Sequence, residues 1–390
     1  MFTLLVSACV MGPDEVPTQM TEQELATAGN IAACPSGTGE YHCHGRVIID
    51  GTGCPHSNPA PTGFGPSQLR SAYKISGTGS SGTTVAVIDA FGYPTAEADL
   101  AIYRAQFGLP TCTTANGCFK KVNQTGTQGS YPSNDQGWAL ETQLDLEMAS
   151  AVCPGCKILL VEASSASLAN LAAAVNTAAK LGATEISNSY GGSEFSSEVS
   201  DTAYNHPGIA VTVASGDSGY GSFGYPAASP YVITVGGTTL TLGTGNAYAG
   251  ESVWSGAGSG CSLYVGAPAW QGFLTACGGK RGTADVAADA NPSTGAAVYD
   301  SVKYQGRTGW FQVGGTSLSS PLIAGVYALA GGLPGKTSAA SGLYGHLGES
   351  AILHDVTSGS NGSCSTIMCK GAAGYDGPTG VGTPKGTGAF

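Results

Sequence analysis

One short motif carries the residue best suited to act as a nucleophile. Gly315 and Thr316 lead into Ser317, and Pro321 and a mostly apolar run over 322–329 follow at once. This order predicts that Ser317 lies at the start of a helix, where free backbone N–H groups and the positive dipole end can stabilise a developing oxyanion. The same string is also typical of an ordinary helix cap with proline in the first turn. Ser317 is therefore a candidate nucleophile, and other polar positions must decide between the two interpretations.

Two carboxylates four residues apart offer proton chemistry. Glu141 and Asp145 fall in a predicted helix over 138–151, and their spacing puts both on one face of it. A solvated acidic face is the alternative interpretation. However, the sequence from 136 to 156 contains no Lys or Arg that could balance these charges. We interpret the pair as placed for proton transfer, with one carboxylate orienting the other and sharing a proton with it.

A further polar position follows a predicted strand. Asp217 lies between two glycines, just after the apolar run 209–214. A turn-forming aspartate is the alternative interpretation. Yet α/β sheets bind their ligands beyond the C-terminal ends of parallel strands. Asp217, Ser317 and the carboxylate pair together therefore predict a functional cleft.

Strands and helices alternate along the chain from residue 63. Short apolar, β-branched runs predict the strands, and helical periodicity predicts the helices between them. The predicted strands cover 84–89, 157–162, 184–189 and 209–214, and the predicted helices cover 95–107, 138–151 and 168–181. This alternation predicts an α/β fold with a mainly parallel central sheet and helices on both faces. The Gly-rich stretch 236–310 is expected to form loops and hairpins around the cleft.

The composition favours an exported protein. The chain has 390 residues, 61 of them glycine, and its net charge is −11 with only 15 Lys and Arg, which argues against nucleic acid as a partner. When the carboxylates are protonated in acid, few positively charged side chains remain to repel one another and unfold the chain. The composition is therefore compatible with activity at low pH. No run approaches the ~18 apolar residues that span a bilayer.

Twelve cysteines predict disulfides in an oxidising compartment, and four close pairs are expected to bond: Cys112–Cys118, Cys153–Cys156, Cys261–Cys277 and Cys364–Cys369.

The first 62 residues lack a sustained periodicity. Residues 1–9 resemble part of a secretion signal that ends in a lipoprotein-like site, with Cys9 as a candidate lipid anchor, although a basic segment is missing. We interpret 10–62 as a Cys-containing N-terminal extension or short pro-segment, and 63–390 as the main domain. Zinc in the extension is a weaker interpretation than disulfides, because the spacing of its histidines and cysteines fits no common zinc finger.

Three motifs, in their order along the chain, resemble the sedolisin family, the serine-carboxyl peptidases with a subtilisin-like fold. They are ExxxD at 141–145, SGD at 215–217 and GTSLSSP at 315–321. The resemblance covers roughly 63–390. It implies that Ser317 is similar to the family's nucleophile, Glu141 to its general base, Asp145 to the residue that orients this base, and Asp217 to its oxyanion-hole acid. A carboxyl group donates a hydrogen bond only while protonated, and a glutamate base has a reference pKa of about 4.3, so activity in acid is expected.

The resemblance extends to one calcium site near the C-terminus. The family's ligands are similar to the carboxylates of Asp355 and Asp376 and to the backbone carbonyls of Val356, Ala372 and Gly374. Oxygen ligands from loops suit Ca²⁺. The position of Ala372 is commonly glycine in the family, but the ligand there is a backbone oxygen.

The resemblance implies a secreted endopeptidase that acts on proteins or peptides, and we expect a monomer. The nearest rival is an ordinary subtilisin-like peptidase using Asp89, which ends the run 84–89. Such an enzyme also needs a histidine at the start of a following helix, but the six histidines, at 42, 44, 56, 206, 346 and 354, all lie elsewhere in the sequence. Glu141 occupies that helix instead. We therefore interpret Asp89 as a supporting residue near Glu141 and Asp145.

A second rival is a secreted binding protein on a retired peptidase scaffold. All four candidate catalytic residues are present, which speaks against it. One departure concerns activation, because family precursors carry a long folded pro-region whereas only some 60 residues precede the domain here. Autoactivation in the usual manner is thus in doubt.

Overall fold

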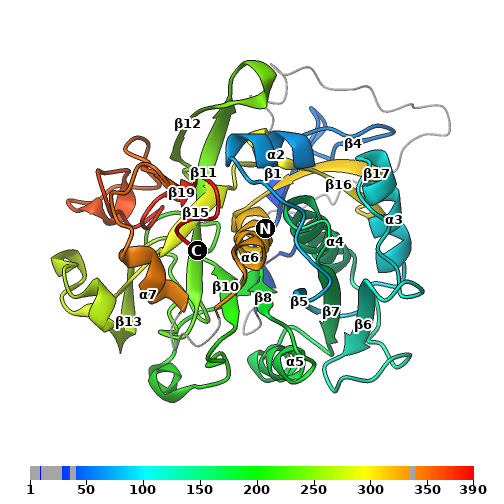
Figure 1. Cartoon of the computed structure of the whole chain (residues 1–390), viewed down its shortest axis with the longest axis horizontal. Helices are drawn as coiled ribbons and strands as arrows, with labels where there is room; N and C mark the ends of the chain where they lie inside the picture. Colours follow the sequence, from blue (N-terminus) through cyan, green and yellow to red (C-terminus); the bar gives the residue numbers. More distant parts are fainter. Residues whose placement is uncertain (1–8, 10–28, 36–40, 334–338) are drawn as a thin grey trace, which may run out of the picture.

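A mainly parallel sheet forms the centre of the computed structural model, which describes residues 9, 29–35, 41–333 and 339–390 (Figure 1). Its strands follow the order β12-β11-β10-β8-β5-β7-β6, and β15 pairs with β11. Only the β11–β12 pair in this sheet is antiparallel. The strands are β5 (Thr84–Ala90), β6 (Phe119–Asn123), β7 (Lys157–Ala163), β8 (Glu185–Asn188), β10 (Ala210–Ala214), β11 (Ile233–Leu242), β12 (Tyr248–Val253) and β15 (Val286–Asp289).

Helices cover both faces of this sheet. α4 (Gln136–Val152) and α6 (Thr316–Ala330) pack against each other on one face, and α5 (Leu168–Lys180) lies on the other, as Figure 1 shows. The peripheral helices are α2 (Pro66–Ala72), α3 (Ala96–Gln106) and α7 (Ala339–Tyr344). Burial of the inner strands on both faces explains their continuous apolar runs. The predicted α/β class and every predicted helix and strand up to residue 214 are confirmed to within about two residues.

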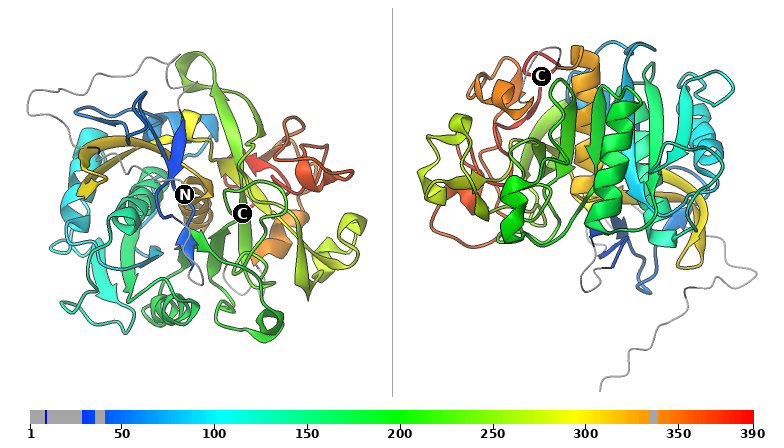
Figure 2. Two further views of the ribbon diagram at one scale, coloured as in Figure 1. Left: turned by 180° about the vertical axis from the view of Figure 1, so that it is seen from behind. Right: turned by 90° about the horizontal axis from the view of Figure 1, so that it is seen from below.

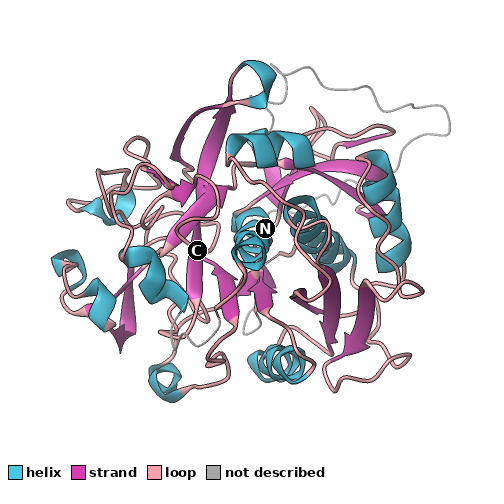
Figure 3. Cartoon of the chain, in the orientation of Figure 1, coloured by secondary structure: helices cyan, strands magenta, loops and turns pink. Residues whose placement is uncertain are grey.

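The prediction of loops and hairpins for 236–310 is partly wrong. β11 and β15 of this stretch belong to the central sheet. Strand propensity did not predict β11, because the strand contains glycines, which are poor strand formers. They are needed for close approach, since a Cβ on Gly236 would collide with the carbonyl of Pro378, and one on Gly237 would collide with Ala290. The expected hairpins are present in the rest of the stretch, where β13 (Cys261–Gly266) pairs antiparallel with β14 (Lys280–Gly282) and β16 (Ala296–Tyr304) with β17 (Arg307–Gly314). Figure 3 distinguishes the strands, helices and loops of the chain.

A second sheet joins the N-terminal segment to the body of the fold. Its order is β1-β3-β17-β16, and β4 also pairs with β17. The strands are β1 (Asn30–Ala32), β3 (Arg46–Ile48), β4 (Ser57–Asn58), β16 (Ala296–Tyr304) and β17 (Arg307–Gly314). Separately, β2 (His42–Cys43) pairs antiparallel with β9 (Tyr190–Gly191). Seen from behind, this blue segment lies across the ends of α4 and α6 (Figure 2).

All four expected disulfides are present in the structure. Two more bonds link Cys34 to Cys43 and Cys9 to Cys54, so the twelve cysteines are all paired. A sulfur in a disulfide cannot also carry a thioether-linked lipid, so the expected anchor at Cys9 is not compatible with this structure. The rest of the expected signal, 1–8, lies outside the described residues. Among the helices that the structure describes, none is long and apolar enough to cross a membrane.

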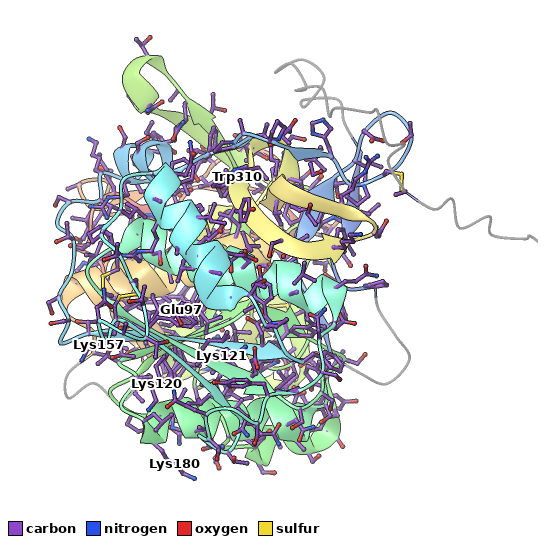
Figure 4. All side chains as sticks on the ribbon, turned by 90° about the vertical axis from the view of Figure 1, so that its right-hand side faces the viewer. Glu97, Lys120, Lys121, Lys157, Lys180 and Trp310 are labelled. Carbon is purple, nitrogen blue, oxygen red and sulfur yellow. A yellow bond between two sulfur atoms is a disulfide. The ribbon has the colours of Figure 1, made fainter. Side chains whose placement is uncertain are left out.

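Several of the few cations lie on one side of the molecule. Figure 4 shows Lys120 and Lys121 of β6, Lys157 at the start of β7 and Lys180 at the end of α5 on this side. Lys121 forms an ion pair of 2.9 Å with Glu162 and lies 4.2 Å from the ring centroid of Tyr131.

Candidate active site

Ser317 lies in the first turn of α6, as predicted. β17 ends at Gly314, and Gly315 turns the chain into the helix with φ of 96°, a conformation that favours glycine. A Cβ on Gly315 would collide with the backbone oxygen of His44 and lie 2.5 Å from Oδ2 of Asp217. The Ser317 side chain is fully buried, and its Oγ donates to the backbone oxygen of Ser189 over 3.3 Å.

Glu141 and Asp145 both project from α4 into the buried region beside α6. Side chains from Gly137 to Val152 of this helix are buried, so the alternative of a solvated acidic face is wrong. Asp145 Oδ1 accepts a hydrogen bond of 2.8 Å from the Ser189 hydroxyl. Burial raises the Glu141 pKa, and the approach of the Ser317 hydroxyl and the Gly45 N–H opposes this rise, although neither has the geometry of a good hydrogen bond.

Asp89 completes a group of buried carboxyls. It ends β5 near the pair on α4, as expected for a supporting residue, and burial raises its pKa to about 8. Burial, and then the charge of Asp89, raise the pKa of Glu141 and of Asp145 well above their ordinary values. Like charges this close cannot all ionise together easily, so the group retains protons that isolated carboxyls would have released.

Asp217 lies on the other side of Ser317, in the loop after β10. Its Oδ1 accepts from the backbone N–H and the hydroxyl of Thr316, over 2.8 and 2.9 Å. Part of the residue reaches the surface, but Oδ2 is buried and has no hydrogen-bond partner among the described residues. Burial raises the Asp217 pKa to about 7, against the opposing effects of Thr316 and the Arg46 charge. Near pH 4 this carboxyl is therefore protonated and has a hydrogen to donate.

Four residues near this site were not predicted from the sequence. Ser189 follows β8 directly, so the strand-end rule that found Asp217 could have found it. Thr316 looked like part of a cap, whereas it holds Asp217 in place. None of the histidines was assigned to the site, whereas the structure places His42 and His44 at the adjoining cavity. No local signal could show that, because these residues lie about 45 positions from Asp89 and almost a hundred or more from the other carboxyls and the serines of the site.

A cavity of about 330 Å³ adjoins the site. It is lined by backbone and small side chains on both sides of Asp217 and by the larger side chains of His42, His44, Glu194, Phe223 and Leu263. Its position beyond β10 agrees with the expectation that ligands bind at the C-terminal ends of parallel strands.

The loop expected to hold calcium brings its two carboxylates together. Asp355 accepts from the N–H of Gly374 over 3.0 Å, and Asp376 accepts from the N–H of Ala372 over 3.1 Å. Burial, with the nearby Asp355 charge as a smaller cause, raises the Asp376 pKa to about 7. Two carboxylates held this close on a loop with backbone oxygens form a donor set that fits Ca²⁺.

Comparisons with known proteins place the fold. The model of the subtilase family matches residues 124–345. Sedolisin from Pseudomonas sp. (strain 101) is 28% identical over 84% of this chain and 60% of its own length, and kumamolisin from Bacillus sp. (strain MN-32) is 30% identical over 84% and 63%. The chain thus spans less than two thirds of the length of these relatives.

Among solved structures, Pseudomonas sedolisin, a serine-carboxyl proteinase complexed with two molecules of pseudo-iodotyrostatin, aligns with a TM-score of 0.70. Its sequence is 28% identical, and the alignment covers 84% of this chain and 96% of that one. The resemblance to the sedolisin family and the subtilisin-like α/β fold are confirmed. The chain belongs to the subtilase family.

Proposed function

We propose that this chain is a secreted serine-carboxyl endopeptidase that acts in acid on proteins or peptides. The observation that carries the proposal is the position of the buried Glu141 carboxyl beside the Ser317 hydroxyl, together with Oδ2 of Asp217, for which the described part of the chain offers no hydrogen-bond partner. A base, a nucleophile and a donor for an oxyanion thus surround one point. The six disulfides support export to an oxidising compartment.

The mechanism follows from these positions. Ionised Glu141 accepts the hydroxyl proton as the Ser317 Oγ attacks the carbonyl carbon of the substrate. The oxyanion then accepts a hydrogen bond from protonated Asp217, which is pre-positioned by Thr316. Glu141 passes its proton to the leaving nitrogen, the C–N bond breaks, and water hydrolyses the acyl ester by the same steps. Asp145 orients Glu141 and shares its proton, with Ser189 holding Asp145.

Asp89 does not contact substrate in this mechanism; it affects the protonation of Glu141 and Asp145. Burial raises the pKa of Asp89 to about 8, so Asp89 is neutral at acid pH and places no negative charge beside Glu141 and Asp145 there. Only when Asp89 ionises does its charge raise the pKa of both. Asp355 and Asp376, with the carbonyls of Val356, Ala372 and Gly374, would hold one Ca²⁺ that stabilises the C-terminal loops.

Hydrolysis of a denatured protein near pH 4 tests the proposal. Ser317→Ala should reduce the rate by several orders of magnitude, as loss of a triad nucleophile does. Ser319→Ala is the matched control, because this buried serine of the same helix turn only bonds to the backbone oxygen of Thr316. Wild-type rates in the Ser317 variant would show that another residue is the nucleophile.

A further inference from the structure

We propose that the Glu194 carboxylate binds a cationic side chain of the substrate, so that this site prefers lysine or arginine before the bond it cleaves. The inference rests on the proposed function and names its substrate class. Glu194 follows β9 and lines the cavity of about 330 Å³ beside Asp217. The mechanism above gives this carboxylate no role.

An extended peptide directs one side chain into this cavity, as the N-terminal segment shows. β2 of this segment pairs antiparallel with β9, and the N–H of His44 donates to the Ser189 oxygen over 3.0 Å. The His44 oxygen and Oδ2 of Asp217 lie against the same side of Gly315, where a Cβ would meet both. The His44 ring borders the cavity. A substrate paired with β9 in this way would place its attacked carbonyl beside Asp217 and the side chain of the same residue in the cavity.

The cavity offers this side chain a negative charge. Apart from the two histidines of the N-terminal segment, small residues make up most of its lining. Glu194 and Asp217 supply carboxyls, and of the residues that the structure describes, no Lys or Arg lines it. Asp217 keeps its proton in acid, because burial raises its pKa to about 7. The charge that a substrate side chain meets there is therefore that of Glu194.

Hydrogen bonds from β13 hold the Glu194 carboxylate in place. Its Oε1 accepts from the Ser262 hydroxyl, and its Oε2 accepts from the N–H of Leu263 over 3.0 Å. The Ser262 oxygen in turn accepts from the N–H groups of Tyr264 and Val265, over 3.1 and 2.8 Å. Each carboxylate oxygen has two lone pairs, so each can still accept from a substrate cation. A carboxylate fixed in this way suits an ammonium or guanidinium group.

A second carboxyl keeps the negative charge on Glu194. Glu198 is buried, and its Oε2 accepts from the N–H of Phe195 over 2.9 Å. Burial, and then the approach of the Glu194 carboxyl, raise the Glu198 pKa to about 8. Glu198 therefore keeps its proton in acid, and this pair of carboxyls carries its charge on Glu194.

The position of the carboxylate favours a long side chain. Burial, and then the charge of neighbouring His42, lower the His44 pKa to about 3, and no carboxylate contributes to this shift. The imidazole thus stops short of Glu194. Lysine and arginine are longer and stay charged in acid. Their apolar stems can lie against Phe223 and Leu263, which also line the cavity.

Peptides that differ only in the residue before the scissile bond test this preference. Lysine and arginine peptides are compared with a norleucine peptide, which has an uncharged chain, on the active enzyme at about pH 5. We expect kcat/KM for the lysine and arginine peptides to exceed that for the norleucine peptide by about tenfold to a hundredfold, as a hydrogen bond between charged groups provides. An equal or higher kcat/KM for norleucine would overturn the inference, and this comparison needs no variant.

Glu194→Gln should lower the ratio of lysine to norleucine kcat/KM by about tenfold or more, mainly through a higher KM for the lysine peptide. Asp201→Asn is the matched control, because it removes a carboxylate outside the cavity lining, and the amide can still accept from the N–H of Ala203. It should keep the wild-type ratio. If Glu194→Gln slows both peptides equally, Glu194 only holds β13 and the inference is wrong.

The outcomes separate this inference from the proposed function. Ser317-dependent hydrolysis without a preference for lysine or arginine would overturn the inference and leave the proposed function standing. Absence of Ser317-dependent hydrolysis of every peptide and of denatured protein would overturn both.

Discussion

The hydroxyl of Ser189 donates to Oδ1 of Asp145 over 2.8 Å, and the backbone oxygen of Ser189 accepts from Ser317 over 3.3 Å. One residue after β8 therefore joins the nucleophile on α6 to the acid pair on α4. The same carbonyl also holds His44.

Ser189→Ala should reduce kcat by about tenfold to a hundredfold and change KM little, because a lost bond to a buried carboxyl costs about 1–3 kcal/mol. The Ser189 hydroxyl lowers the Asp145 pKa, so its loss should also move the acid limb of the pH–rate profile to higher pH. A lower melting temperature with an unmoved pH profile would mean that Ser189 has only a structural role.

Asp217→Asn should retain substantial activity and weaken the decline at the alkaline side. The amide oxygen can accept from Thr316 as Oδ1 does now, while the amide nitrogen replaces Oδ2 and donates without a proton to lose. Asp217→Ala is the matched comparison, and loss of one oxyanion donor costs about a hundredfold to a thousandfold in kcat. Equal rates for the Asn and Ala variants would contradict a donor role for this position.

The folded protein should be more stable in acid than at neutral pH. Burial raises the pKa of Asp89 to about 8 and of Asp217, Asp300 and Glu185 to about 7. A carboxyl group whose pKa is higher in the folded chain than in the unfolded chain stabilises the folded state while it is protonated. This contribution is complete below about pH 4 and is lost as the pH rises through about 7 to 8. The melting temperature of uncleaved Ser317→Ala, with chelator present, should fall by about 5 °C or more between pH 4 and pH 8. A higher melting temperature at pH 8 would contradict the burial of these groups as neutral acids.

Calcium should stabilise the chain near neutral pH. An ion at a hundredfold excess over its Kd contributes about 2.7 kcal/mol to the folded state. Chelation should lower the melting temperature of Ser317→Ala, and Asp376→Asn should lose this response. Glu349→Gln removes an exposed carboxylate elsewhere in the C-terminal region and should keep the response. Identical melts with and without chelator would exclude the site.

Much of the fold could be predicted because its signals are local. Apolar runs such as β5 and β10 and the periodicity of α4 need no knowledge of distant residues. β11 escaped prediction because Gly236 and Gly237 serve contacts with Pro378 and Ala290, which lie far along the chain.

The same distinction applies to the site. Ser317, Glu141 and Asp217 carry motifs, so their chemistry could be inferred before their positions were known. The segment around His44 carries none, and its place in the cleft depends on pairing with β9 and β17. Long-range strand pairing of this kind leaves little trace in a short stretch of sequence.

The pH dependence of kcat/KM tests the central claim most directly. A histidine base has a reference pKa of about 6.5 and loses activity as it protonates, so a histidine-dependent subtilisin should be weak near pH 4. Here activity requires ionised Glu141 together with protonated Asp217. Full activity therefore needs the pKa of Asp217 to be higher than the pKa of Glu141 when the cleft is open to substrate. The account predicts a bell centred in the acid range for the active enzyme, measured on one peptide substrate. An optimum near pH 8 with negligible turnover near pH 4 would contradict it.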